Sequence, residues 1–279
     1  MMKIGIVGLG LIGGSMAKAI RLNTDHYVFG TDIDKSIVTR AKIMEAINEE
    51  LTDDRISQCD MIILALYPDA TIEFMNKNAC HIKKGAYVID CGGVKEKVCS
   101  AVSTLAGEYG FVFVGGHPMA GIEKIGFKYS DANIFADASM ILTPDDCTKI
   151  EALADIKIFF LSIGFGKITT KTPEDHDRII AYTSQLAHVL SNAYVKSETA
   201  KEHKGLSAGS FKDLTRVAYL NETMWTELFL ENKHNLINEI EILIKNLSQY
   251  KEALEKEDSK GLMGLLKSGR ELKERLDNE

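Results

Sequence analysis

A histidine that follows two glycines is the residue of this chain best suited to acid–base chemistry. In the stretch FVFVGGHPMAGIEK, residues 111–124, an apolar strand pattern ends in two glycines and is followed by His117. An imidazole accepts a proton near neutral pH, and a position just past a strand lies at the sheet edge where α/β proteins bind ligands. We therefore expect His117 to act as a catalytic base. The alternative is a buried histidine with structural hydrogen bonds.

A carboxylate and a guanidinium form a second candidate group nearer the C-terminus. In SFKDLTRVA, residues 210–218, Asp213 and Arg216 are three residues apart and share one face of a predicted helix. The carboxylate would hold the guanidinium for a bidentate grip on a substrate carboxylate. An ordinary surface ion pair has the same spacing, and the spacing alone slightly favours that alternative.

The glycine run GLGLIG, residues 8–13, directly follows the strand pattern KIGIV and opens an amphipathic helix pattern. Its first glycine allows a tight turn, its second lets a pyrophosphate approach the backbone, and its third allows close packing of helix on strand. The free N–H groups at the helix start attract an anion. In this context the run predicts a dinucleotide site that involves Gly8, Gly10, Leu11, Ile12 and Gly13.

An acidic residue at the end of the next strand pattern completes this site. Asp32 follows HYVFGT about twenty residues after Gly10, where the carboxylate that binds the adenosine ribose is expected. Such a carboxylate repels a 2′-phosphate, which favours NAD over NADP. Asp34 is an alternative for this role, and Asp32 as a plain turn residue is another. In LALYPD, Leu66 and Pro68 are expected beside the adenosine half, although Pro68 also fits a simple turn.

The elements that must position these residues divide the chain into two parts. Short β-branched runs alternate with helical stretches as far as Pro173, the last of the four prolines, which predicts a mostly parallel sheet with crossover helices. The strand patterns are KIGIV, HYVFGTD, MIILAL, AYVID, FVFVG, SMILT and GKITT, and the helical stretches are residues 11–22, 35–44, 69–78, 95–106 and 145–155. We place the domain boundary near residue 168, so that residues 1–168 form the α/β domain.

Residues 169–279 have a helical pattern almost throughout. Between Asn221 and Leu254, apolar residues recur at alternating steps of four and three and predict one face of a long helix. They are Leu236, Ile240, Leu243, Leu247, Tyr250 and Leu254. Ile237, Ile242 and Ile244 add apolar surface outside this face, which favours cover by a second subunit. Burial within one chain is the alternative.

Composition excludes several classes of partner. The net charge of −7 provides no basic surface for nucleic acid, and the sequence contains no apolar stretch long enough to span a bilayer. The start has no signal-peptide pattern, so we expect a cytoplasmic protein that binds a small molecule. The five cysteines include no C-x-x-C pair and are expected to be reduced. The histidines do not stand at metal-ligand spacings, so no metal is expected.

Four segments together resemble the prephenate dehydrogenase family, in order along nearly the whole chain. They are GLGLIGGS at 8–15, GGHPMAG at 115–121, HDRIIAYTSQLAHVLSNA at 176–193 and FKDLTRVAYLNETMW at 211–225. The resemblance implies an NAD-binding Rossmann domain, a doubly wound parallel sheet, followed by an all-helical domain that binds substrate and forms a homodimer. It also implies that His117 is the catalytic base, that Arg216 holds a substrate carboxylate and that Asp213 orients Arg216.

The implied reaction is the oxidative decarboxylation of prephenate in tyrosine biosynthesis. Loss of hydride from the hydroxyl-bearing ring carbon to NAD gives a ketone that accepts the electrons released with CO2, and aromatisation drives the step. His117 would take the hydroxyl proton. By the same resemblance, Glu123 and His188 lie at or near the substrate pocket, with a structural role as the alternative for each. Trp225 would line the pocket or pack at the domain interface.

Two positions depart from the family pattern. The segment DCGGVK has Gly93 where the family often has a serine that orients the catalytic histidine, so a water or a backbone group would have to substitute. In SQLAH, Gln185 stands where a histidine is usual; its amide can donate to the substrate but cannot titrate. Both changes affect substrate binding more than the type of reaction.

Three other functions stay open from the sequence. Arogenate differs from prephenate only by an amino group in place of the side-chain keto group, so an arogenate or cyclohexadienyl dehydrogenase would use the same base. A β-hydroxyacid-type dehydrogenase would need a lysine base, for which no matching sequence setting is found. A non-catalytic NAD-sensing protein would keep the glycine run and Asp32 but tolerate loss of His117.

Overall fold

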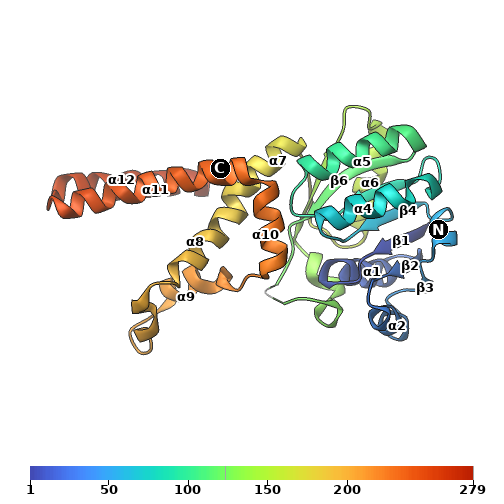
Figure 1. The fold of residues 1–279 in the computed structure, drawn as a ribbon, viewed down its shortest axis with the longest axis horizontal. Helices are drawn as coiled ribbons and strands as arrows, with labels where there is room; N and C mark the ends of the chain where they lie inside the picture. The colour runs from blue at the N-terminus through green and yellow to red at the C-terminus, as the bar shows by residue number, and fades with distance from the viewer. Residues whose placement is uncertain (123, 279) are drawn as a thin grey trace.

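The computed structural model describes residues 1–122 and 124–278, which form an α/β domain and a helical domain that extends to one side of it (Figure 1). The α/β domain contains one sheet of eight strands in the order β3-β2-β1-β4-β5-β6-β7-β8. The strands are β1 (Lys3–Val7), β2 (Tyr27–Thr31), β3 (Glu49–Glu50), β4 (Met61–Leu64), β5 (Tyr87–Asp90), β6 (Val112–Pro118), β7 (Ser139–Pro144) and β8 (Lys167–Thr170).

Every neighbouring pair in the sheet is parallel except β6 and β7. The chain proceeds from β1 to β2 and β3 on one side and returns to β4 on the other, so the strand order reverses between β1 and β4. In open parallel sheets this switch point is where ligands bind, beyond the carboxyl ends of the strands. The glycine run GLGLIG begins directly at the end of β1.

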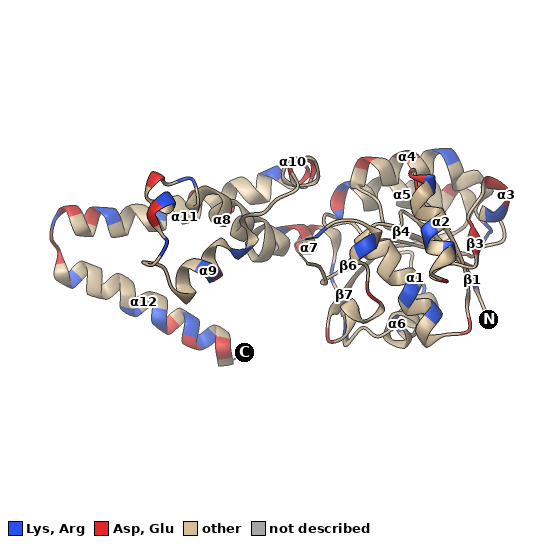
Figure 2. Ribbon diagram, turned by 90° about the horizontal axis from the view of Figure 1, so that it is seen from below, with Lys and Arg blue, Asp and Glu red and all other residues tan. Residues whose placement is uncertain are grey.

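Helices cover both faces of the sheet and enclose two apolar cores (Figures 1 and 2). One core lies under α1 (Leu11–Asn23), α2 (Lys35–Ile43) and α6 (Ile150–Ser162). The other lies under α3 (Asp53–Ile56), α4 (Pro68–Asn78) and α5 (Glu96–Tyr109). The central strand β4 is buried along its whole length, which explains its uninterrupted apolar sequence.

The helical domain begins with a single long helical rod. It comprises α7 (Pro173–Ile180), the π-helical segment η4 (Ala181–Leu186) and α8 (Ala187–Tyr194). The chain then forms η5 (Glu198–Glu202), α9 (Gly209–Thr215), the short turn η6 (Arg216–Ala218) and α10 (Glu222–Glu231). Finally, α11 (Lys233–Glu255) and α12 (Ser259–Asn278) pack as a hairpin that projects away from the α/β domain (Figure 1). No helix within the described residues is long and apolar enough to cross a membrane.

The predicted strands and helices of the α/β domain are confirmed, with differences at particular positions. The two-residue strand β3 was not predicted, and β8 pairs with β7 as far as Thr170, so the sheet continues two residues past the expected boundary at 168. The predicted apolar helix face lies on α11, which begins only at Lys233 because the chain breaks helical geometry at Asn232. All five cysteines are free.

Candidate functional site

The glycine run forms a cradle that side chains would fill. Gly8 has φ +86°, a conformation that favours glycine, and a Cβ there would meet the Ala65 carbonyl oxygen at 2.5 Å. A Cβ at Gly13 would lie 1.8 Å from the Gly8 carbonyl oxygen, so only glycine lets α1 start this close to the strand. Gly10 faces open space and precedes α1 without a side-chain cap. The backbone at this point is therefore open to a ligand.

The start of α1 offers unpaired N–H groups to an anion. The first N–H that bonds within the helix belongs to Gly14, which donates to the Gly10 carbonyl oxygen at 3.0 Å. The preceding groups at Leu11 and Ile12 belong to the first turn, where an α-helix has no internal acceptors and carries partial positive charge. These are the groups that a pyrophosphate would use.

Asp32 lies at the end of β2 and faces a cleft of about 410 Å³. One of its carboxylate oxygens accepts the Leu9 N–H at 2.8 Å, and the other accepts the Asp34 N–H at 3.0 Å. These two bonds fix the carboxylate beside the glycine run. Asp34 instead caps α2 by accepting the Ser36 N–H, so the two acidic residues have different tasks.

The walls of the cleft combine apolar side chains with excess negative charge. Ile33 and Leu66 supply apolar surface, while Asp32, Asp53 and Glu73 outnumber Lys77 as charged lining groups. Leu66 lines the same cleft as Asp32, and its contact with the adenosine half stays a prediction. Pro68 does not line this cleft: it is buried as the first residue of α4, a position that suits proline because its missing N–H is not needed there.

His117 lies in β6 just beyond the point where this strand leaves the parallel sheet. Pairing of β6 with β5 ends at Val114, whereas pairing with antiparallel β7 continues and places His117 opposite Ile141. The strand was expected to end at the two glycines, but pairing with β7 extends it to Pro118. Gly115 and Gly116 are required because a Cβ at either would lie within 2.6 Å of neighbouring atoms. The half-buried His117 is thus presented at the carboxyl edge of the parallel strands.

A buried ion pair supports the backbone that carries His117. Lys95 and Asp90 are 0% and 1% exposed, and the lysine ammonium donates to the Asp90 carboxylate. The ammonium also donates to the Gly116 carbonyl oxygen at 2.6 Å, while the Gly116 N–H donates to Asp90 at 3.1 Å. Both backbone groups of the residue before His117 are therefore fixed by one charged pair.

The His117 side chain is held from the helical domain. Its Nδ1 lies 2.9 Å from Nε2 of His176, and Nδ1 of His176 lies 2.6 Å from a carboxylate oxygen of Asp177. Both partners lie in α7 and are buried. A water or a backbone group was expected to orient His117 in place of the family serine at position 93. The imidazole of His176 orients the His117 ring from the helical domain, and what takes the place of the family serine at position 93 stays a prediction.

The surroundings of His117 favour its neutral form. Burial, the neighbouring His176 ring and the Lys95 ammonium together hold the pKa of His117 well below its ordinary value. Burial also lowers the pKa of His176, against the opposing effect of its bond to Asp177. At neutral pH both rings are therefore uncharged, and His117 is ready to accept a proton.

The helical domain contributes a second group of candidate site residues from α8 and α10. The Nδ1–H of His188 donates to the Ser184 carbonyl oxygen at 2.8 Å, and its ring contacts Trp225 with centroids 4.0 Å apart and the planes tilted by 33°. Trp225 in turn packs against Phe229. His188 lies two residues past the end of the π-helical segment, a feature common at functional sites.

Gln185 differs from its expected role. It is buried, its Nε2 donates to the Leu228 carbonyl oxygen at 3.1 Å, and its Oε1 accepts from Asn232 at 2.9 Å. Asn232 also donates to the Asp177 carbonyl oxygen at 2.8 Å. Gln185 therefore joins the rod to the junction of α10 and α11, and its amide is committed to the protein.

The remaining expected substrate residues lie on separate elements. Arg216 is the first residue of η6, which packs on α8, and Asp213 is exposed on α9. Gly93 lies before α5, and a Cβ there would meet only Leu228 of α10, at 3.4 Å. Glu123 lies outside the described residues. These positions place Gly93 at the boundary between the two domains.

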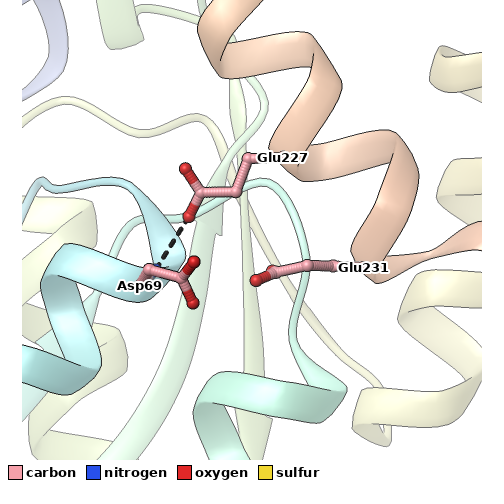
Figure 3. A group of neighbouring side chains, drawn as sticks. All are labelled: Asp69, Glu227 and Glu231. Atoms are coloured by element: carbon pink, nitrogen blue, oxygen red, sulfur yellow. Dashed lines mark hydrogen bonds between the residues drawn. The ribbon is translucent and has the colours of Figure 1, made fainter.

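A charged cluster joins the two domains outside the expected site (Figure 3). Carboxylate oxygens of Asp69, Glu227 and Glu231 lie within 4.8 Å of one another, and Glu227 accepts the Asp69 N–H at 2.8 Å. Lys97 of α5 forms ion pairs with Asp69 and Glu231. The lysine thus binds α4 and α5 to α10, and the cluster acts as an interdomain ion-pair network.

Comparison with known proteins identifies the family. The family model described as "Prephenate dehydrogenase, nucleotide-binding domain" matches residues 16–169, and "Prephenate dehydrogenase, dimerization domain" matches residues 172–268. The chain belongs to the prephenate dehydrogenase family. The two matched ranges meet close to the expected domain boundary.

Individual relatives agree with this family over nearly the full chain. A prephenate dehydrogenase of Lactococcus lactis is 29% identical, covering 99% of this chain and 78% of its own length. A cyclohexadienyl dehydrogenase of Zymomonas mobilis is 31% identical, covering 93% and 91%. The crystal structure of an Aquifex aeolicus prephenate dehydrogenase with hydroxyphenyl propionate and NAD⁺ is 30% identical, covering 100% and 99%, with a TM-score of 0.87.

Within this family site, sequence reasoning missed four residues that the structure brings to His117. They are Lys95, Asp90, His176 and Asp177. The segments DCGGVK and HDRIIAYTSQLAH were noticed, but only for Gly93, Gln185 and His188. The adjacent charges in DCGGVK and in the His-Asp pair were the available signals, since charged residues beside apolar strand and helix patterns are buried only when paired.

Proposed function

We propose that this chain is an NAD-dependent prephenate dehydrogenase that oxidatively decarboxylates prephenate to 4-hydroxyphenylpyruvate. The observation that carries the proposal is the presentation of a neutral His117 at the carboxyl edge of a sheet whose switch point holds a dinucleotide cradle. A proton acceptor beside a dinucleotide site is the minimum requirement for oxidation of an alcohol.

The residues of the cradle fit NAD. Gly8, Gly10 and Gly13 leave room for the pyrophosphate, the N–H groups of Leu11 and Ile12 face it, and Asp32 would bind the ribose hydroxyls. The negative excess in the cleft, with Asp53 and Glu73 near Asp32, opposes a 2′-phosphate and favours NAD over NADP. When bound, NAD supplies the oxidising power by accepting hydride from the substrate.

His117 performs the acid–base part of the reaction. Its Nε2 would accept the proton of the ring hydroxyl as that carbon is oxidised, which typically accelerates a reaction by on the order of 10²–10⁴-fold. Lys95 and Asp90 fix the Gly116 backbone so that the imidazole stays in place. A neutral His117 at neutral pH makes the base available without prior loss of a proton.

The helical domain would bind the rest of the substrate. Arg216 would hold a substrate carboxylate as a bidentate donor, with Asp213 orienting it and Glu123 nearby. The role of Arg216 is positioning, because stabilising the carboxylate only in the ground state would slow its departure as CO2. The neighbouring rings of His188 and Trp225, tilted by 33° to each other, would offer a partly apolar surface to the ring of the substrate.

The apolar surface of the hairpin supports a homodimer. Ile237, Ile242 and Ile244 are about half exposed, and Leu247 and Leu254 on the same helix are exposed as well. Exposed apolar side chains gathered on one helix favour a protein–protein interface. The domain that carries it matches the dimerization domain of the family. A cytoplasmic location stays a prediction from the sequence.

A second candidate substrate is arogenate, since one full-length relative is a cyclohexadienyl dehydrogenase. The deciding experiment measures NADH or NADPH formation at 340 nm with prephenate or arogenate and with NAD or NADP, in all four pairings. The proposal predicts turnover of prephenate with NAD. Turnover of arogenate alone would assign the second function. Binding of NAD without turnover of either substrate would contradict both and favour a non-catalytic protein.

A further inference from the structure

We propose that His176 and Asp177 are a positioning pair that fixes the tautomer of His117, so that Nδ1 carries the hydrogen and Nε2 is the nitrogen that accepts the substrate proton. The inference rests on the proposed function for its kinetic consequence. The tautomer itself is a property of the protein without substrate. It follows from four hydrogen bonds whose directions can be assigned in sequence, from the carboxylate outward.

The assignment begins at Asp177, whose carboxylate accepts two backbone N–H groups. Lys95 N donates to one oxygen at 2.8 Å and Glu96 N donates to the other at 2.9 Å. These donors stand at the N-terminus of α5, where an anion is stabilised by the helix dipole. Asp177 is therefore held as an ionised, acceptor-only group.

His176 must then donate from Nδ1. Its Nδ1 lies 2.6 Å from the oxygen of Asp177 that also receives the Lys95 N–H. An ionised carboxylate cannot donate, so the hydrogen of this bond belongs to His176 Nδ1. Because burial keeps His176 neutral, its other nitrogen, Nε2, has a lone pair and no hydrogen.

His117 must consequently donate from Nδ1 to His176. The two nitrogens are 2.9 Å apart, and the only hydrogen available for the bond is on His117 Nδ1. A neutral imidazole carries one hydrogen, so Nε2 of His117 is left with its lone pair. When Nε2 accepts a proton from the substrate hydroxyl, Nδ1–H keeps its bond to His176, and no further proton needs to move.

The surrounding structure keeps this pair in place. His176 is 1% and Asp177 3% exposed, and the side chain of Asn232 donates to the Asp177 carbonyl oxygen. The pair belongs to α7 of the helical domain, whereas His117 belongs to the sheet of the other domain. The tautomer of His117 therefore depends on correct docking of the helical domain against the α/β domain.

Two substitutions at His176 separate positioning from plain packing. In His176→Asn the side-chain amide occupies the Nδ1 position and can still donate to Asp177, but it is too short to reach His117. In His176→Gln the amide oxygen occupies the Nε2 position and can accept from His117 Nδ1. His203→Asn, at a half-buried histidine of the helical domain that bonds Ser207, is the control. Circular dichroism and thermal unfolding verify that each variant folds.

The first readout is the long-range ¹H–¹⁵N NMR spectrum of the histidine rings at neutral pH, with His117→Asn used to identify the His117 signals. We expect His117 in the unchanged protein and in His176→Gln to have a protonated Nδ1 and a bare Nε2. In His176→Asn we expect a shift toward the Nε2–H tautomer. An Nε2–H tautomer in the unchanged protein, or an unchanged tautomer in a folded His176→Asn, would overturn the inference.

The second readout is a double-mutant cycle on turnover. We expect His176→Asn to lower kcat by on the order of 10–10²-fold with little change in KM, since a misplaced reacting group costs about that much, and His176→Gln to recover most of the loss. In a His117→Asn background, adding His176→Asn should lower kcat no further. An equal loss in both backgrounds would show a structural role and overturn the inference. If the unchanged protein turns over no substrate, the proposed function fails, and the NMR spectrum still decides the tautomer.

Discussion

The buried pair of Lys95 and Asp90 provides a quantitative test of how the site is supported. The substitution Lys95→Met keeps a side chain of similar length and removes the charge. It leaves the Asp90 carboxylate, 1% exposed, with backbone donors at Gly92 and Gly116 but without a counter-charge. It also removes the ammonium that holds the Gly116 carbonyl oxygen.

The expected cost follows from the burial of both partners. Removing one partner of a buried ion pair typically lowers the free energy of unfolding by about 3–5 kcal/mol. For a domain of this size, this corresponds to a fall in Tm of roughly 6–20 °C. The matched control is Lys35→Met, because Lys35 forms an ion pair with Glu50 at 2.6 Å while its side chain is 69% exposed. An exposed pair of this kind contributes about 0–1 kcal/mol.

Urea unfolding followed by circular dichroism measures both variants against the unchanged protein. We expect the free energy of unfolding to fall by at least about 2 kcal/mol more in Lys95→Met than in Lys35→Met, since only the first substitution leaves a buried charge unpaired. Turnover should fall in Lys95→Met alone, because the backbone that carries His117 loses its support. Equal and small losses of stability in the two variants would refute the reasoning from burial.

Three further predictions concern the cofactor, the base and the dimer. Asp32→Asn should raise the KM for NAD by on the order of 10–100-fold, which corresponds to the free energy of a hydrogen bond to a charged group. Asp34→Asn should leave this KM within about threefold, because Asp34 caps α2. A larger effect of Asp34→Asn would reassign the ribose contact to Asp34. Because burial, His176 and Lys95 lower the pKa of His117, the base becomes protonated only at lower pH than an ordinary histidine. We therefore expect kcat/KM to stay level down to pH 6.5 and to fall only below it. A fall that begins above pH 6.5 would contradict this. Ile244→Glu on α11 should yield monomers in light scattering after size-exclusion chromatography, whereas Ile150→Glu, at an exposed position on α6, should not; a dimer that survives Ile244→Glu would place the interface elsewhere.

Local sequence patterns predicted most of the α/β domain. The β-branched runs around β1 and β4 are apolar and bounded by turn residues, so their strand character is independent of distant contacts. The two glutamates of β3 carry no such pattern, because pairing with β2 alone makes them a strand. Asn232 gave no visible signal of a helix break, since its buried contacts to Asp177 and Gln185 come from residues far away in the sequence.

The site was predicted in part, for a similar reason. The glycine run and Asp32 form a local motif with fixed spacing, and His117 stands out because glycines precede it. His176 lies 59 residues from His117 in the chain, and only the docking of α7 against the sheet brings the two rings together. Lys95 is one of 33 basic residues, and its complete burial depends on the crowding of Asp90 and Gly116 around it. Contacts of this kind depend on tertiary structure and leave no periodic signal.

The role of His117 as the base is tested most directly by replacing its imidazole with an amide. The measurement is the rate of NADH formation from prephenate and NAD at 340 nm for His117→Asn, beside the unchanged protein and the control His203→Asn, with NAD affinity measured by calorimetry. We predict a kcat at least about 10²-fold lower in His117→Asn alone, with NAD affinity retained, since the acceptor of the hydroxyl proton is lost and the cradle is not. A kcat within a few-fold of the unchanged protein would contradict the assignment of His117 as the base.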